Sequence, residues 1–496
     1  MTWREYHEST KHSVESLRRS PHVLDWANMP DPFRHYEGVP LLDLPANPPV
    51  PDMPALAVLN GISGIRPRVD GSTFLSQLLF YSAAISTSKR SPTGYRYALR
   101  VNPSSGNLHP TEFHFFTQGL NDWPDGLYHY RPSAHMAEQR ALGHPGLKLA
   151  GGSAPILFVL TSLVWREAWK YRDRAYPYCL LDIGHAWQAL ALAARAMGCD
   201  AFATGHFPDD EVAQLLRPHE DEWPMLIVEV RGASIPVCEQ DAREAVWYGG
   251  EANQISADTT ACSRIDVIHE ATKLRHWATP RISAAEPDPT GSGEINLPPH
   301  ASSSLAVSRA FGDVARMRRS ALNFLGGMQS MSLAQLSAIL AVAARPFSAD
   351  FAGEPFIRLY LYVHRVDGLQ PGVYRLGSDT AGLEQIRSGD QRVAAAGLSL
   401  AQELAGNACV AFSMIGDLDR AARAHGDRGY RYVHFEAGAI GHRMYLAAEA
   451  LGLGATGMGA FYDEEVHRYL NLTPEQGQVV YHFAIGYPVP DSRLSA

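Results

Sequence analysis

Two short polar segments carry residue types that suit the binding of a ligand. Pro103-Ser104-Ser105-Gly106-Asn107 places two hydroxyls, a carboxamide and several backbone N–H groups directly before a strand-like segment. Such a loop suits a polar planar ligand or a phosphate, although the same residues are typical of an ordinary turn. Arg318-Arg319-Ser320 is interpreted as a helix start that could hold an anion by bidentate donation, or as a solvated basic surface.

Two further segments could act on a bound molecule. Lys170 and Tyr171 precede a long apolar segment, where desolvation can lower the pKa of a lysine and make it a general base. The alternative is a lysine that extends to solvent beside a packed tyrosine. Gly457-Met458-Gly459 would let main-chain N–H groups approach a ligand closely, or would simply lead out of a helix. Taken alone, each of these four segments fits its structural alternative better.

An internal repeat suggests how the four segments meet. Residues 173–216 align without a gap with residues 427–470, and the register is constant, since Gly198 matches Gly452 and Phe207 matches Phe461. A repeat of this length indicates two copies of one domain. A duplicated domain usually recreates a dimer within one chain, and the sites between its halves are then free to diverge.

Each copy alternates helical and strand patterns. Copy one has helical spacing over 73–86 and a long apolar helix over 179–198 that Gly198 ends. A helix that is apolar all round must be buried, most economically against its counterpart in the other copy. Strand patterns occupy 111–118, 125–132, 154–163 and 225–232, and copy two repeats the order.

These patterns predict a tandem α+β fold that forms an intrachain pseudo-dimer. The expected divisions are an N-terminal arm (1–70), a first domain (71–240), a linker with one helix (241–300) and a second domain (301–496). The helix of the linker is expected within 262–277, and 283–294 is expected to be a flexible loop.

Composition narrows the class of protein. The 496 residues, 46% hydrophobic and 19% charged, fit a globular chain of several domains, and the net charge of −9 argues against nucleic acid as a partner. Five scattered cysteines without a CxxC pair argue against a zinc or iron–sulfur site and fit a reducing compartment. No secretory apolar region and no membrane-spanning run stand out, so we expect a cytoplasmic protein without a metal centre.

In combination, the four segments resemble the flavin-dependent nitroreductase superfamily. There, a basic-basic-Ser segment, a PSSxN loop, a long central helix and a glycine-containing loop surround FMN. PSSGNLHPTEF (103–113) is similar to that loop, with His109 where Gln is common. The segments 173–198 and 429–461 are most similar to the SagB/ThcOx branch, which includes azoline-oxidising dehydrogenases of peptide natural-product pathways. The resemblance implies a nitroreductase-like fold, FMN as cofactor and a small-molecule or peptide substrate.

The same resemblance implies a single composite site, because FMN lies between subunits in the family. Copy one keeps the polar loop, but 65–68 and 86–90 are poor counterparts of the Arg-Arg-Ser segment; copy two keeps that segment, and its polar loop within 344–355 is eroded. The opposite pseudo-site is expected to be empty or remodelled. The residues implied to hold FMN are Pro103, Ser104, Ser105, Asn107, Arg318, Arg319, Ser320, Gly457, Met458, Gly459 and Arg493.

In azoline-oxidising relatives a Lys-Tyr pair is catalytic, which implies this role for Lys170 and Tyr171; the repeat register places Ala424 and His425 in the other copy. The resemblance implies hydride transfer to flavin N5, with the N–H groups of 457–459 near N5 or O4. A second basic residue often follows the Ser by two positions, but Leu322 stands there, and Arg100 is a candidate replacement.

Two other functions fit the sequence. One is an NAD(P)H-dependent reductase of nitro or quinone compounds, and the other is a flavin-free scaffold protein that uses a decayed fold. A monomer is expected in each case, because the pseudo-dimer needs no second chain to complete its site.

Overall fold

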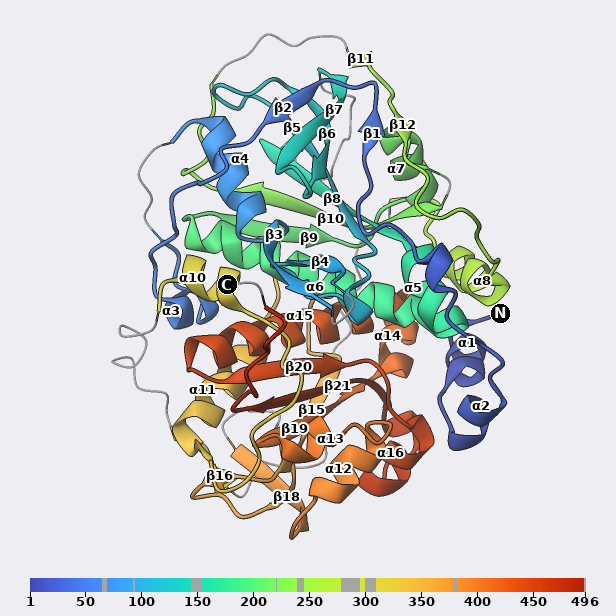
Figure 1. The fold of residues 1–496 in the computed structure, drawn as a ribbon, viewed down its shortest axis with the longest axis vertical. Helices are drawn as coiled ribbons and strands as arrows, with labels where there is room; N and C mark the ends of the chain where they lie inside the picture. The colour runs from blue at the N-terminus through green and yellow to red at the C-terminus, as the bar shows by residue number, and fades with distance from the viewer. Residues whose placement is uncertain are drawn as a thin grey trace.

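The computed structural model describes residues 1–64, 69–91, 94–143, 154–219, 221–238, 245–277, 295–298, 309–377 and 382–494. Two α+β halves lie above and below a pair of central helices (Figure 1). No helix within these ranges is both long and apolar enough to cross a bilayer. The segments 65–68 and 283–294, which the sequence analysis considered, lie outside the described residues.

The sheets of the two halves share one strand order. In the first half the order is β7-β6-β5-β8-β10-β9, and in the second it is β18-β17-β15-β19-β21-β20, with antiparallel pairing throughout. Linker strands extend both sheets, β11 (Val246–Trp247) beside β7 and β13 (Ile295–Asn296) beside β18. The first-half strands are β5 (Thr111–Thr117), β6 (Gly126–Arg131), β7 (Met136–Leu142), β8 (Ile156–Leu163), β9 (Asp200–Thr204) and β10 (Glu222–Arg231). Their counterparts are β15 (Ile357–Val363), β17 (Gly372–Leu376), β18 (Gly382–Ser388), β19 (Val410–Gly416), β20 (Gly454–Met458) and β21 (Gln478–Gly486).

The helices repeat in the same register and confirm the duplicated fold. The central helices α6 (Ala175–Ala196) and α15 (Gly429–Ala450) have 22 residues each. Gly198 and Gly452 follow them with φ of 74° and 75°, the left-handed conformation that ends a helix at glycine without a Cβ penalty. The other matched pairs are α4 (Gly71–Phe80) with α11 (Leu333–Ala343), α5 (Val164–Tyr171) with α14 (Leu418–His425), and α7 (Asp209–Leu216) with α16 (Asp463–Leu470).

The two halves meet where α6 crosses α15 at one glycine from each helix. A Cβ on Gly184 would overlap the carbonyl oxygen of Phe435, and a Cβ on Gly438 would overlap that of Leu181. Only glycine lets two helix backbones approach this closely. The matched positions Gly184 and Gly438 of the repeat are therefore the contact between the halves.

Reciprocal buried ion pairs flank this crossing. Arg174 reaches Asp463 in the second half at 2.9 Å, and its counterpart Arg428 reaches Asp209 in the first half at 2.5 Å. Arg431 also contacts Asp209, at 2.7 Å. Because all of these side chains are buried, removing one partner would leave an uncompensated charge, which is strongly destabilising. The ion pairs fix the rotation of the halves about the crossing.

The segments outside the repeat are more structured than a linker and an arm suggest. The linker contains the expected helix, α8 (Ser263–Thr272), and also β12 (Glu251–Ala252), which pairs with β1 (Tyr36–Glu37) of the arm. The remaining elements of the arm are α1 (Trp3–Thr10), α2 (Val14–Arg19), β2 (Leu41–Asp43) and α3 (Ala55–Leu59).

One local expectation is wrong. Arg318, Arg319 and Ser320 follow the end of a helix, α10 (Phe311–Met317), and do not begin one. The chain leaves the helix at Arg318 with an extended backbone, and Ser320 and Ala321 then run beside Ala455 of β20. The segment is placed by this strand-like pairing, so no helix N-terminus contributes to anion binding there.

The glycine crossing predicts a contrast between two alanine substitutions. Gly184→Ala places a methyl group against the α15 backbone, and overpacking of this kind costs about 1–3 kcal/mol. Gly397→Ala, in the exposed helix α12 (Arg392–Leu398), meets nothing within 4 Å and should stabilise by about 0.5–1 kcal/mol, because alanine favours the helix. Urea unfolding of both variants checks this. A Gly184→Ala protein as stable as the wild type would contradict the close helix contact.

Candidate active site

A cavity of about 1320 Å³ lies between the two halves. Its walls contain residues 102–109 and the Lys170–Tyr171 pair from the first half, and residues 457–460 and Arg318 from the second. Small-molecule sites generally measure about 300–1,000 Å³, so this cavity has room for more than one ligand. The structure thus brings together the polar loop, the Lys-Tyr pair and the glycine loop.

The polar loop is held in a specific conformation before β5. The Ser104 hydroxyl oxygen accepts from the N–H of His109 at 2.8 Å, and the Asn107 amide donates to the carbonyl of Ala98 at 3.0 Å. Gly106, Asn107 and His109 all have positive φ, between 51° and 61°. Backbone conformations of this kind are costly for non-glycine residues and persist where the surroundings enforce them, often at functional sites.

Lys170 and Tyr171 end α5 directly behind this loop. A Cβ on Gly106 would lie 2.7 Å from the Tyr171 Oη and 3.0 Å from the Lys170 Nζ. Only glycine leaves room here for both functional groups. The loop and the Lys-Tyr pair therefore touch one another and face the same cavity, as the sequence predicts from their shared retention in copy one.

Two buried acids lie beside this pair, and sequence reasoning missed both. Asp182, on the cavity side of α6, accepts from the N–H and the hydroxyl of Ser105, each at 3.0 Å. Burial raises the pKa of Asp182 to about 7, although hydrogen bonds from Ser104 and Ser105 lower it. Within the described chain, neither carboxylate oxygen of Glu167 has a hydrogen-bond partner. Burial, together with the nearby Asp182, raises the pKa of Glu167 well above its usual range.

The second half contributes Arg318, which crosses the interface between the halves. Its Nε donates to the carbonyl of Val101 at 3.1 Å and one Nη donates to that of Arg100 at 3.3 Å. Ser320 bonds to the hydroxyl of Tyr445 at 2.9 Å. Arg318 and Ser320 both line the cavity, and Arg318 contacts the backbone just before the polar loop.

Two expected roles change in the structure. Arg319 does not line the cavity, because its guanidinium donates to the carbonyls of Arg316 and Arg318. Gly457 lines the cavity, but its N–H donates to Tyr445; in the described chain, the N–H groups without an acceptor in this loop are those of Gly459 and Ala460. Arg100 lines the cavity, where its Nη atoms donate to the carbonyls of Thr111 and Pro32 and its Nε has no partner in the described chain, so its role as the replacement basic residue stays a prediction.

The C-terminal segment of the second half crosses onto the hairpin of β3 (Ile85–Arg90) and β4 (Arg96–Arg100). The carbonyl of Arg493 accepts from the N–H of Arg90 at 2.9 Å, and Asp491 pairs with Lys89 at 2.7 Å. The guanidinium of Arg493 bonds to Asp491 and lines the cavity. This crossing brings Arg493 from the second half to a wall that the first half supplies.

Several buried polar atoms of the cavity walls have no partner in the described chain. They are Arg100 Nε, Asn102 Oδ1, His109 Nδ1, His185 Nδ1 and Arg318 Nη1. Leaving a buried donor or acceptor unpaired costs about 1–3 kcal/mol, so five in one cavity indicate a polar ligand. Donors and acceptors from both halves suit the polar edge of a flavin ring, and the cationic Arg318 suits an anionic group.

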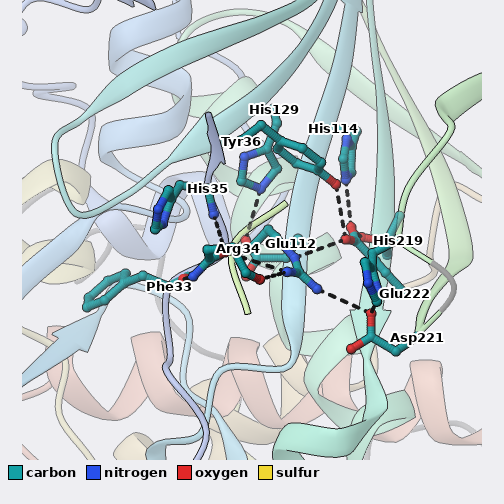
Figure 2. Close-up of polar contacts among 12 residues, drawn as sticks. Phe33, Arg34, His35, Tyr36, Glu112, His114, His129, His219, Asp221 and Glu222 are labelled. Atoms are coloured by element: carbon teal, nitrogen blue, oxygen red, sulfur yellow. Dashed lines mark hydrogen bonds and ion pairs between the residues drawn. The ribbon is translucent and has the colours of Figure 1, made fainter. Parts of the chain in front are cut away.

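The N-terminal arm closes one side of the cavity. Residues 29–33 line it, and the segment that follows is fastened to the first sheet. Figure 2 shows Arg34 directed towards Glu222 and Asp221, and Tyr36 beside Glu222. The Arg34–Asp221 distance is 3.2 Å, and the Tyr36 hydroxyl donates to Glu222 at 3.3 Å. One wall of the cavity is therefore built by residues outside the repeat.

Residues of the second copy stand in the opposite pseudo-site at the positions where the first copy has its polar loop. The β5 and β15 registers make Phe351 the counterpart of Ser105, and its ring stacks on Tyr432 with centroids 4.4 Å apart. The neighbouring Asp350 accepts from the N–H groups of Gly205 and His206, at 2.7 and 3.1 Å. These two N–H groups correspond to those of Gly459 and Ala460. The second copy has thus filled its own site with an aromatic ring and a carboxylate.

Comparison with known proteins agrees with this architecture. The sequence model of the nitroreductase family matches the chain twice, over residues 83–232 and 315–487. The chain belongs to the nitroreductase family. As a member of this family with two matched segments, it is a tandem nitroreductase-type oxidoreductase whose cavity lies between its own two copies.

Individual relatives cover the chain to different extents. It is 32% identical over 167 residues to MJ1384 of Methanocaldococcus jannaschii, which is named as a nitroreductase, covering 32% of this chain and 83% of that protein. It is 25% identical over 155 residues to the trifolitoxin-processing protein TfxB of Rhizobium leguminosarum bv. trifolii, covering 29% of this chain and 42% of TfxB. A crystal structure from Anabaena variabilis, described as a nitroreductase, shares the fold with a TM-score of 0.76 at 24% identity, and covers 98% of this chain and 99% of its own.

The raised pKa of Glu167 predicts a pH-dependent effect on stability. An acid whose pKa rises on folding destabilises the folded chain increasingly as the pH rises above its unfolded value near 4.5. Glu167→Gln should therefore be more stable than the wild type at pH 8, and this gain should shrink as the pH falls towards 5. Urea midpoints across this range check the effect, with the exposed Glu251→Gln as control. A gain that grows towards low pH would contradict the assignment.

Proposed function

We propose that the protein is an FMN-dependent oxidoreductase of the SagB/ThcOx type, with one active site per chain. The observation that carries this proposal is the cavity itself, in which the polar loop and the Lys170–Tyr171 pair of one copy face Arg318 and the glycine loop of the other. The sequence resemblance to the SagB/ThcOx branch and the likeness to TfxB, a peptide-toxin processing protein by name, support a peptide-derived or azoline-type substrate.

The residues present fit FMN. Arg318, Ser320 and Arg493 would hold the polar and anionic parts from the second half, and Ser104, Asn107 and His109 would face the ring from the first. The N–H groups of Gly459 and Ala460 are placed to donate to its polar edge. When bound, FMN would supply the acceptor for the hydride that leaves the substrate carbon.

The proton that leaves with the hydride has a defined destination. Lys170 in its neutral form would accept it at Nζ, so that the substrate loses one hydride and one proton and gains a double bond. Tyr171, whose pKa burial and the nearby Glu167 raise well above its usual range, stays protonated and can donate a hydrogen bond through Oη. Dioxygen is the proposed final electron acceptor. Residues 29–33 of the arm line the same cavity as this pair.

A reductase that takes electrons from NAD(P)H remains the second candidate, because family membership alone allows it. The half-buried Lys-Tyr pair against Gly106 favours the oxidase, since hydride transfer from a nicotinamide needs no base. The FMN-free scaffold is the least supported candidate, because the cavity is open and lined with unpaired polar atoms.

The composite site predicts one FMN per chain. Arg318→Ala combined with Ser104→Ala should abolish the flavin absorbance of the purified protein, because each charge-assisted contact contributes about 1.5–3 kcal/mol. Arg345→Ala, at an arginine beside Gly61 and outside the cavity, should keep the wild-type flavin content. The measurement is the absorbance ratio of flavin to protein. Two equivalents of FMN, or full pigment in the double variant, would refute the composite site.

The catalytic pair predicts which half-reaction depends on Lys170. With an azoline-containing peptide, Lys170→Ala should slow anaerobic flavin reduction about 100-fold or more, because a general base contributes that much. Lys273→Ala, at a lysine paired with Asp210 away from the cavity, should react at the wild-type rate. Stopped-flow absorbance measures both. Rapid bleaching of the wild type by NADPH, equally fast in Lys170→Ala, would instead identify the reductase.

A further inference from the structure

Asp182 has a position that no motif explains. It is a carboxylate 2% exposed, the one acid of α6, and it opens onto the cavity. Its two oxygens receive the N–H of Ser105 at 3.0 and 3.1 Å, and one of them also receives the Ser105 hydroxyl at 3.0 Å. The polar loop is thus fastened to α6 through one residue.

The residue that Asp182 binds is adjacent in sequence to a residue that contacts the Lys-Tyr pair. Ser105 is followed by Gly106, whose backbone lies against the Tyr171 Oη and the Lys170 Nζ. A shift of the Ser105 backbone would move Gly106 towards or away from these groups. The position of Lys170 relative to the cavity therefore depends on the hydrogen bonds between Asp182 and Ser105.

We propose that Asp182 is a positioning residue: its ionised carboxylate holds the 103–107 loop, and through Gly106 the Lys170–Tyr171 pair, in the working geometry. This inference rests on the proposed function. Both oxygens act as acceptors in the ionised form. Protonation turns one of them into a donor that faces the Ser105 N–H and hydroxyl, so some of the hydrogen bonds between Asp182 and the loop are lost.

The surroundings of Asp182 favour a change of state near neutral pH. Burial raises the pKa of Asp182 to about 7. The titratable and charged groups around it come from α5, α6, β21 and the segment after α10. They are Glu167, Lys170 and Tyr171 of α5, Tyr178, Cys179 and His185 of α6, Tyr481 of β21, and Arg318. Glu167 carries the one other carboxylate in this set, and burial together with Asp182 raises its own pKa well above its usual range.

The repeat supplies a matched control. Glu436 occupies the position of Asp182 on α15, is also buried, and has a pKa that burial raises to about 7. Its carboxylate accepts from the N–H of Ile357 at 2.9 Å, at the start of β15. It lies outside the cavity walls. A substitution there changes the same kind of buried acid without touching the loop.

The experiment compares kcat against pH, from 5.5 to 9, for the wild type, Asp182→Asn and Glu436→Gln with the azoline-containing peptide. The wild-type rate should rise through a limb near pH 7. Asp182→Asn should lose this limb and fall about 10-fold or more below the wild type at pH 8, with a smaller change in KM, whereas Glu436→Gln should keep the limb. An unchanged limb in Asp182→Asn would overturn the proposal.

Two further measurements keep the test decisive. Amide hydrogen exchange of residues 103–109 at pH 8 needs no flavin and no substrate, and it should be faster in Asp182→Asn and unchanged in Glu436→Gln. Equal protection in Asp182→Asn would overturn the proposal, even if the proposed function had already failed through an absence of FMN. Should Asp182→Asn not fold, Ser105→Ala removes one hydrogen bond to the carboxylate and should move the limb to higher pH; no movement would also overturn it.

Discussion

The close contact of two helix backbones at Gly184 and Gly438 is the constraint on which the rest of the structure depends. Because each glycine fits against a carbonyl region of the other helix, α6 and α15 can cross at one point only. The reciprocal pairs Arg174–Asp463 and Arg428–Asp209 then fix their rotation. This geometry places the end of α5 near the loop that follows β20. It places their counterparts, the end of α14 and the loop that follows β9, near one another in the same way. One interface therefore creates two related spaces.

The interface is symmetric, but the two spaces are not. In the cavity, the N–H groups of Gly459 and Ala460 have no acceptor within the described chain, whereas Asp350 takes the equivalent groups of Gly205 and His206. Phe351 fills the volume that Ser105 leaves open on the other side. The carboxylate and the ring satisfy donors and volume that a ligand would otherwise satisfy. One copy therefore keeps a polar loop beside an open cavity, and the other fills the equivalent space with its own side chains.

The sequence predicted the features that a repeat or a local motif encodes. The constant register predicted the central helices, and the polar loop, the Lys-Tyr pair and the glycine loop all line one cavity. What it missed depends on contacts distant along the chain. No motif marks Asp182 or Glu167, although a lone acid in the largely apolar helix α6 is itself a signal for Asp182. The sequence indicated an N-terminal arm but not its attachment, which Arg34 makes through carboxylates nearly two hundred positions away. Arg319 turns from the cavity because nearby carbonyls accept its guanidinium.

The divergence of the halves is clearest where the sequence changed least. Asp182 and Glu436 are acids at the same position of matched helices, equally buried and with pKa values raised alike. They differ in their hydrogen-bond donors. Glu436 accepts from the N–H of Ile357, the first residue of β15, whereas Asp182 accepts from Ser105 in a loop whose next residue, Gly106, lies against the Lys170 Nζ and the Tyr171 Oη. A strand fixed by its neighbours on both sides gains little from one more hydrogen bond, whereas a loop with three residues in the left-handed region depends on each bond it makes. The same buried acid is therefore structural in one half and can affect chemistry in the other.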